Sequence, residues 1–190
     1  MRVEQAKEII KPLMTEKRFD HTLRVAETAV ELASIFGENQ ARAELAALLH
    51  DYAKCMDLSL LKRWIETSNL PKDLLLHHHE LWHGPVGALM IRQNHGINDT
   101  EILNAVHYHT TGRPHMSRLE MIIFLADYIE PGRNFPGLEE VREVAREDLV
   151  KGCWLASGRT IRYLMDKQSA IYPESFQAYN DLTLKIHGGM

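Results

Sequence analysis

Apolar residues recur along most of the chain at the spacing of a helix. In residues 15–37 they follow a single stripe, formed by Phe19, Leu23, Ala26, Val30 and Ala33. Thr15 is a suitable N-cap for this helix, and Gly37 is a suitable stop.

Similar stripes occupy six further stretches, residues 39–54, 57–69, 84–96, 99–109, 117–129 and 137–149. Residues 151–186 predict one or two more helices, with a break around Tyr172 and Pro173. No stretch alternates apolar and polar residues as a strand would, and no repeat divides the chain. The pattern predicts an all-α fold, a compact bundle of eight to ten helices.

The composition narrows the class of protein. The chain has 190 residues, 45% hydrophobic and 25% charged, which fits a single domain over residues 1–190. With a net charge of -4 and no basic block, a duplex nucleic-acid surface is not expected. No signal peptide is evident, and no run approaches the about 18 apolar residues of a membrane span. Two cysteines without a CxxC motif favour a reducing compartment, so the cytoplasm is the expected location.

The eleven histidines raise the question of metal ligands. Residues 79–83, HELWH, match the HExxH pattern of zinc metallopeptidases, which needs one continuous helix. Pro85 follows almost at once and is best placed in the first turn of a new helix, so the match is interpreted as accidental. The run His77, His78 and His79 is expected to be a solvated loop, because consecutive residues of a helix point in different directions.

A second set of ionisable residues lies at apolar helix positions or helix ends: His21, His50, Asp51, His83, His109 and Asp127. Taken singly, each histidine could be a hydrogen-bonded core residue, and each aspartate a buried ion pair or a cap between helices. Taken together, four imidazoles and two carboxylates match the donors that a pair of divalent transition metals prefers, and one carboxylate could bridge both ions. A metal would also offset the cost of burying the two carboxylates.

The spacing of these residues resembles a known family. The adjacent His50-Asp51 is similar to the pair that gives the HD-domain metallophosphohydrolases their name. Six segments in order tighten the match to the YqeK family over about residues 18–174: RFDHTLRV, LLHDYAK, HGPVGA, YHTTGRPHMS, LADYIEPGRNFPG and AIYPES. The resemblance implies symmetrical hydrolysis of diadenosine tetraphosphate to two ADP by a metal-activated water. It also implies that the six residues named above bind two metal ions, with Asp51 as the bridge. Iron is the first choice, with manganese or zinc as alternatives.

The same resemblance implies the substrate contacts. Asp51, Lys54 and Arg133 would be the catalytic residues, and Arg18 would hold phosphate through its guanidinium. The remaining expected contacts are His83, His109, Thr110, Ala170, Ile171, Tyr172, Pro173 and Glu174, with the C-terminal helices completing the nucleotide pocket. Each has an ordinary alternative, because the cations could be solvated surface charges, Thr110 a helix cap, and residues 170–174 a plain connection between helices.

Two other functions stay open from the sequence. An HD phosphohydrolase could act on mononucleotides, cyclic nucleotides or guanosine alarmones, because specificity lies in loops. A non-catalytic nucleotide-sensing or ribosome-associated protein could also retain the pocket. A homodimer is a further conjecture, since the apolar C-terminal helices could pack internally or against a second copy.

Overall fold

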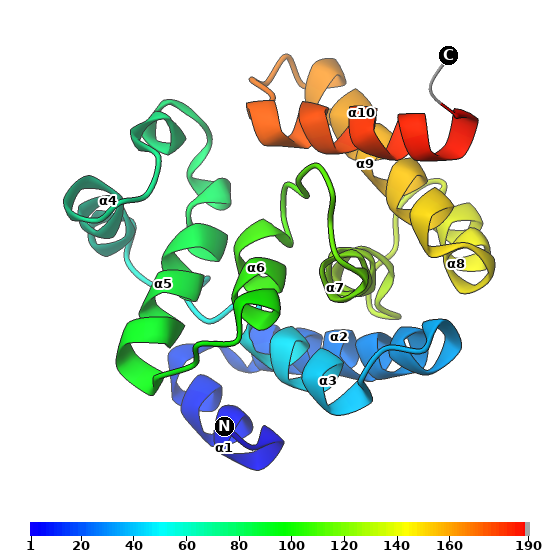
Figure 1. The fold of residues 1–190 in the computed structure, drawn as a ribbon. Coiled ribbons are helices and arrows are strands. Elements are labelled where there is room, and N and C mark those ends of the chain that lie inside the picture. Colours follow the sequence, from blue (N-terminus) through cyan, green and yellow to red (C-terminus); the bar gives the residue numbers. More distant parts are fainter. Residues whose placement is uncertain (189–190) are drawn as a thin grey trace.

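The computed structural model of the chain describes residues 1–188, and within that part it contains helices and no strand (Figure 1). The ten α-helices are α1 (Val3–Ile10), α2 (Glu16–Phe36), α3 (Gln40–Leu49), α4 (Leu58–Thr67), α5 (His83–His95), α6 (Thr100–Tyr108), α7 (Arg118–Ile129), α8 (Leu138–Glu147), α9 (Leu149–Asp166) and α10 (Pro173–His187). Three short 3-10 helices are η1 (Lys11–Leu13), η2 (Lys72–Leu76) and η3 (His79–Leu81). The predicted all-α class is confirmed.

Helix α7 runs through the centre of the bundle, where Figure 1 shows it almost end-on. Its sequence is apolar nearly all round, and Leu119, Ile122, Ile123 and Leu125 are completely buried. A helix without a polar face must be covered on all sides. Helices α2, α3, α6, α8 and α9 pack around it, which places the last turn of α7 close to α2 and α3.

The predicted ends of α2 are confirmed. Thr15 is the N-cap, and its Oγ1 accepts a hydrogen bond from the Arg18 amide at 3.3 Å. Gly37 ends the helix with φ of 67°, a left-handed conformation that glycine adopts without strain. Helix α2 packs along α3, so the first turns of α2 lie on the same side of the bundle as the residues that follow α3.

Helices α5 and α6 cross closely at Gly84. A Cβ atom at this position would lie 2.6 Å from the backbone carbonyl oxygen of His107, so only glycine allows this approach. The crossing brings the start of α5 beside the end of α6.

The C-terminal helices α8, α9 and α10 pack on one another beside α7. The predicted break between α9 and α10 is confirmed, with Tyr172 as the N-cap of α10 and Pro173 in its first turn. None of the helices in residues 1–188 is both long enough and apolar enough to cross a bilayer.

Candidate metal centre

The six residues singled out in the sequence come from five parts of the fold. His21 lies in the second turn of α2, His50 caps the end of α3, and Asp51 follows it in a turn. His83 opens α5, His109 caps the end of α6, and Asp127 lies in the last turn of α7. Helix ends can present side chains inward without interrupting helix packing, which is why most of the set lies there.

Asp51 is the centre of this cluster. Its Oδ2 atom lies 3.1 Å from His50 Nε2 and 3.7 Å from His21 Nε2. Its Oδ1 atom lies 3.1 Å from His83 Nε2 and 3.8 Å from His109 Nε2. The carboxylate is only 2% exposed. Two groups of three donors, each compact enough to hold one cation, therefore share Asp51.

Asp127 closes one end of the cluster, with its Oδ1 atom 3.1 Å from His21 Nε2 and 3.9 Å from His50 Nε2. At the other end the Nε2 atoms of His83 and His109 lie 3.0 Å apart. The cluster thus has a His21–Asp127 end and a His83–His109 end, with Asp51 between them.

The hydrogen bonds of two imidazoles direct their free nitrogen into the cluster. The Nδ1 atom of His50 donates to the Ala47 carbonyl at 2.6 Å, and that of His109 to the Val106 carbonyl at 2.7 Å. A carbonyl only accepts, so Nε2 of these rings carries a lone pair. The Nε2 atoms of His21 and His50 are buried and hydrogen-bonded to no atom of the described residues. Buried lone pairs grouped with carboxylates are the donor set of a divalent metal.

The protonation states of the cluster residues also fit a metal site. Burial acts to raise the pKa of Asp51, but its close contacts with His50 and His83 hold it well below its usual value. Burial likewise acts against ionised Asp127, whereas the close contact with His21 and the charge of Arg133 lower its pKa. Burial and the neighbouring His83 and His50 lower the pKa of His109 to about 3. Ionised carboxylates beside a neutral imidazole are in the protonation states that metal binding requires.

Two of the expected phosphate ligands border the cluster. The Arg18 Nη1 atom donates to Asp51 Oδ2 at 2.8 Å, and the Arg133 Nη2 atom donates to Asp127 Oδ1 at 2.6 Å. Thr110 lies at the other end, with its Oγ1 atom 3.1 Å from His109 Nε2. Lys54, in contrast, is ion-paired with the exposed Glu80.

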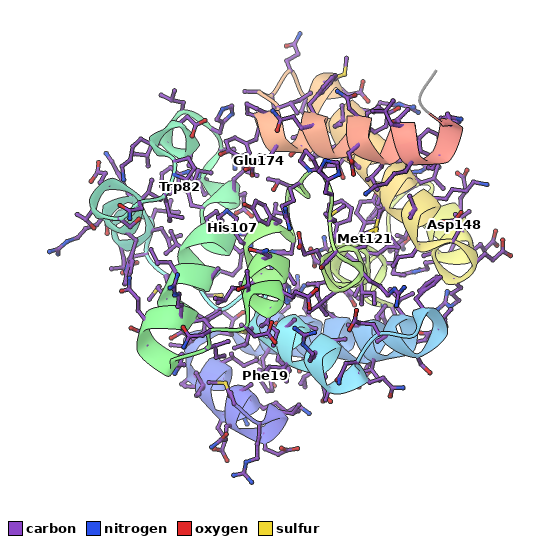
Figure 2. All side chains as sticks on the ribbon, in the orientation of Figure 1. Phe19, Trp82, His107, Met121, Asp148 and Glu174 are labelled. Carbon is purple, nitrogen blue, oxygen red and sulfur yellow. The ribbon has the colours of Figure 1, made fainter. Side chains whose placement is uncertain are left out.

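The expected nucleoside loop, residues 170–174, joins α9 to α10. Ala170 and Pro173 are exposed, Ile171 and Glu174 are half-buried, and Tyr172 is buried. Figure 2 shows Glu174 at the start of α10, beyond the end of α6 that carries His107. The loop therefore lies toward the His83–His109 end of the cluster.

The structure corrects one interpretation of the histidine run. His78 and His79 are exposed as expected, but His77 is half-buried, and its ring meets that of Tyr172 at a centroid distance of 5.0 Å. His77 therefore belongs to the wall beside residues 170–174. The HELWH pattern does span two elements, since η3 ends at Leu81 and α5 begins at His83. The interpretation of that match as accidental is confirmed.

Sequence reasoning missed the pair Glu130 and Arg24. Glu130 is 2% exposed and lies just past the end of α7. Its Oε1 atom accepts from His21 Nδ1 at 3.1 Å, while its Oε2 atom accepts from Arg24 Nε and the Gly132 amide, each at 2.6 Å. A glutamate at the end of an apolar helix, three residues after Asp127, was the available signal.

It also missed the ion pair that fixes the loop after His109. Arg113 donates to both carboxylate oxygens of Glu120, at 2.6 and 2.7 Å, and its guanidinium lies over the Tyr108 ring. Glu120 is 2% exposed, so this pair is a rigid attachment rather than a surface contact.

With the site described, comparison with known proteins identifies the family. The model of the HD domain family matches residues 18–132. This chain belongs to the HD domain family. The HD domain and the buried histidine–aspartate cluster together indicate binding of divalent metal.

Relatives of this HD-domain protein extend the similarity over almost the whole chain. It is 46% identical over 181 residues to the symmetrical bis(5'-nucleosyl)-tetraphosphatase of Halalkalibacterium halodurans, covering 95% of this chain and 97% of the relative. It is 44% identical over 180 residues to the Bacillus subtilis protein of the same name, covering 95% and 97%. The predicted YqeK-type relationship is confirmed.

A solved structure supports the fold of this HD-domain protein. The crystal structure of a predicted HD superfamily hydrolase involved in NAD metabolism, from Clostridium acetobutylicum, superimposes with a TM-score of 0.90 at 37% identity. The alignment covers 96% of this chain and 97% of that one. The helical arrangement of this chain is therefore shared with a solved structure of the HD superfamily.

Proposed function

We propose that this protein hydrolyses diadenosine tetraphosphate symmetrically and releases two molecules of ADP. The observation that carries the proposal is the buried Asp51 carboxylate with a pair of histidines at each of its oxygens. The relatives that are similar over almost the whole chain are symmetrical bis(5'-nucleosyl)-tetraphosphatases, which supports this substrate over other nucleotides.

The site would hold two divalent metal ions. His21, His50 and Asp127 would bind one ion, His83 and His109 the other, and Asp51 would bridge them. Iron is proposed as the metal, while manganese and zinc accept the same nitrogen and oxygen donors. When bound, the metals would supply an activated water and positive charge for the phosphate oxygens.

The hydrolysis joins a water oxygen to one of the two central phosphorus atoms and breaks the bond from that phosphorus to the bridging oxygen. The bridging oxygen leaves with the second ADP, and the proton from water balances the charge. Arg18 and Arg133 border the cluster and are proposed to hold oxygens of the central phosphates as charge develops on the leaving group. Lys54 is proposed to leave its exposed partner Glu80 and bind phosphate, where it would stabilise the charge on the leaving group.

The nucleoside of one half is proposed to lie against residues 170–174. Burial, with Glu174 nearby, raises the pKa of Tyr172 to about 12, so its hydroxyl stays protonated and can donate. Thr110, at the end of α6, would contact phosphate between this loop and the cluster. The C-terminal helices would in this way complete the pocket of a single domain formed by residues 1–190.

Two further statements belong to the proposal. The cytoplasm is the proposed location, supported by Cys55 and Cys153 being free thiols. A homodimer is proposed from the exposed apolar side chains Tyr163, Met165, Phe176 and Leu184 on α9 and α10.

The deciding experiment incubates the purified protein with iron(II) or manganese(II) and diadenosine tetraphosphate, and resolves the products by chromatography. ADP as the sole nucleotide product supports the proposal, whereas AMP with ATP would contradict it. Turnover only of other nucleotides would favour a different HD phosphohydrolase, and tight nucleotide binding without turnover would favour a sensor.

The Asp51→Ala variant is expected to lose bound metal and activity together, because both halves of the cluster use this carboxylate. Asp166→Ala, which removes an exposed carboxylate of α9, is the matched control and should change neither. Full metal content in Asp51→Ala would show that Asp51 is not the bridge.

A further inference from the structure

A cavity opens at the His21–Asp127 end of the cluster, away from residues 170–174. Its volume is about 440 Å³, which is within the usual range for small-molecule sites. His21 forms part of its wall, so the cavity reaches the cluster itself. Lys17, Arg18, Arg24 and Arg133 also line it, together with the single carboxylate Glu130.

The charges of this cavity favour an anion. Arg24 is held by Glu130, and Asp20 and Glu27 lie close enough to interact with it. Four cationic side chains and one carboxylate line the cavity. Arg18, Arg24 and Arg133 each contact a carboxylate. Lys17 is exposed and is the lining cation without an ion pair among the described residues, and it is available to a phosphate.

The cluster therefore has different surroundings at its two ends. The His83–His109 end adjoins Thr110 and lies toward the proposed nucleoside loop. The His21–Asp127 end adjoins the cationic cavity. The substrate carries a nucleoside diphosphate on each side of its central bond, so its two halves extend in different directions from the reacting phosphorus. Residues 170–174 would bind one half, and the other half needs a second site.

We propose that the cationic cavity binds the phosphates of the second nucleoside diphosphate half of the substrate. This inference rests on the proposed function and adds the direction in which the second half lies. Arg18 and Arg133 stand where the cavity meets the cluster, and Lys17 and Arg24 continue the positive surface outward along α2. The second ADP would be released through this opening.

Lys17 provides the cleanest test, because its side chain is exposed in the first turn of α2 and supports no other residue. Lys17→Glu places a negative charge near a helix N-terminus, where it does not destabilise the helix. The KM for diadenosine tetraphosphate is expected to rise about fivefold to tenfold, with kcat within about twofold of the wild type. Lys17→Arg should keep the wild-type KM. Lys151→Glu, the same charge change at the start of α9, is the matched control and should leave KM unchanged.

A second measurement does not depend on turnover. Equilibrium dialysis of the manganese-loaded protein with ADP is expected to detect two ADP sites per chain, one of which is weakened about fivefold to tenfold in Lys17→Glu. A single ADP site, or an unchanged KM in Lys17→Glu while the wild type still forms ADP, would overturn the second half-site and leave the hydrolase function standing. A wild type that forms no ADP from diadenosine tetraphosphate would overturn the function, and this inference with it.

Discussion

The carboxylate of Glu130 lies behind the imidazole of His21, with 3.1 Å between Oε1 and Nδ1. The opposite nitrogen of the same ring faces Asp127 and Asp51. A buried carboxylate in this position fixes the Nδ1–H tautomer and the angle of the ring. Since Arg24 and the Gly132 amide hold the other oxygen of Glu130, the ring cannot turn without breaking several hydrogen bonds.

Replacing Glu130 by glutamine should therefore weaken metal binding without removing a ligand. We expect a loss of about 10-fold to 100-fold in metal affinity, as is usual when the partner of a ligating histidine is changed. Titration calorimetry with manganese(II) measures this effect, and Glu147→Gln on the exposed side of α8 is the matched control. An unchanged metal affinity in a folded Glu130→Gln protein would show that the contact between Glu130 and His21 plays no part in metal binding.

Gly84 lets α5 and α6 approach, and this approach places His83 beside His109. An alanine at this position would bring its Cβ to 2.6 Å from the His107 carbonyl, so the helices must separate. We expect Gly84→Ala to lower the free energy of unfolding by about 1–3 kcal/mol, the usual range for overpacking. Urea denaturation checks this value.

Gly87→Ala, one turn further along α5, is the control. Its Cβ would be 3.5 Å from the Ala53 Cβ, an ordinary contact, and we expect little or no destabilisation. Equal losses of unfolding free energy in the two variants would show that the crossing of α5 and α6 does not depend on Gly84.

The two cysteines should differ sharply in reactivity. Cys55 is exposed, whereas Cys153 is buried in α9, where burial and the charge of Asp148 raise the pKa of its thiol. Because the thiolate is the reactive form, iodoacetamide should alkylate Cys55 alone in the native protein. Peptide mass spectrometry identifies the modified residue, and urea-unfolded protein provides the control in which both react. Native alkylation of Cys153 would mean that this part of the core opens.

Two histidines at the end of α6 should make the metal-free protein sensitive to acid. Burial and Arg113 lower the pKa of His107 to about 4, and burial with neighbouring histidines lowers that of His109 to about 3. In the unfolded chain both take up protons near pH 6.5, which the folded state does not accept until a lower pH. The free energy of unfolding should therefore fall as the pH falls from about 6.5 toward 4, by up to about 1.4 kcal/mol per pH unit for each group.

The His107→Leu variant tests this assignment, because one of the two groups is then absent. In the chelator-treated protein, urea denaturation between about pH 7 and pH 5 should show a shallower pH dependence than in the wild type. His78→Leu, at an exposed position, is the control and should keep the wild-type slope. The same slope in His107→Leu would contradict the lowered pKa of His107.

Much of this molecule could be predicted from the sequence because helices are local. The 3.6-residue stripes and the residues Thr15 and Gly37 located α2 correctly. The six clustered residues were recognisable because ionisable side chains in apolar surroundings need partners. Glu130 was not recognised, since its role depends on the distance from α7 to α2, which no local pattern contains. His77 was misjudged for the same reason, because Tyr172 lies far along the chain.

The order of the cluster residues along the chain has a consequence for synthesis. Asp51 meets His50 within one turn, but its Oδ1 atom meets His83 and His109, and the set closes only with Asp127. A growing polypeptide that stops before residue 127 therefore lacks one of the six donors, and such a fragment cannot assemble the complete site. The complete six-residue site is thus formed late in synthesis, after α7 has docked against the helices made before it.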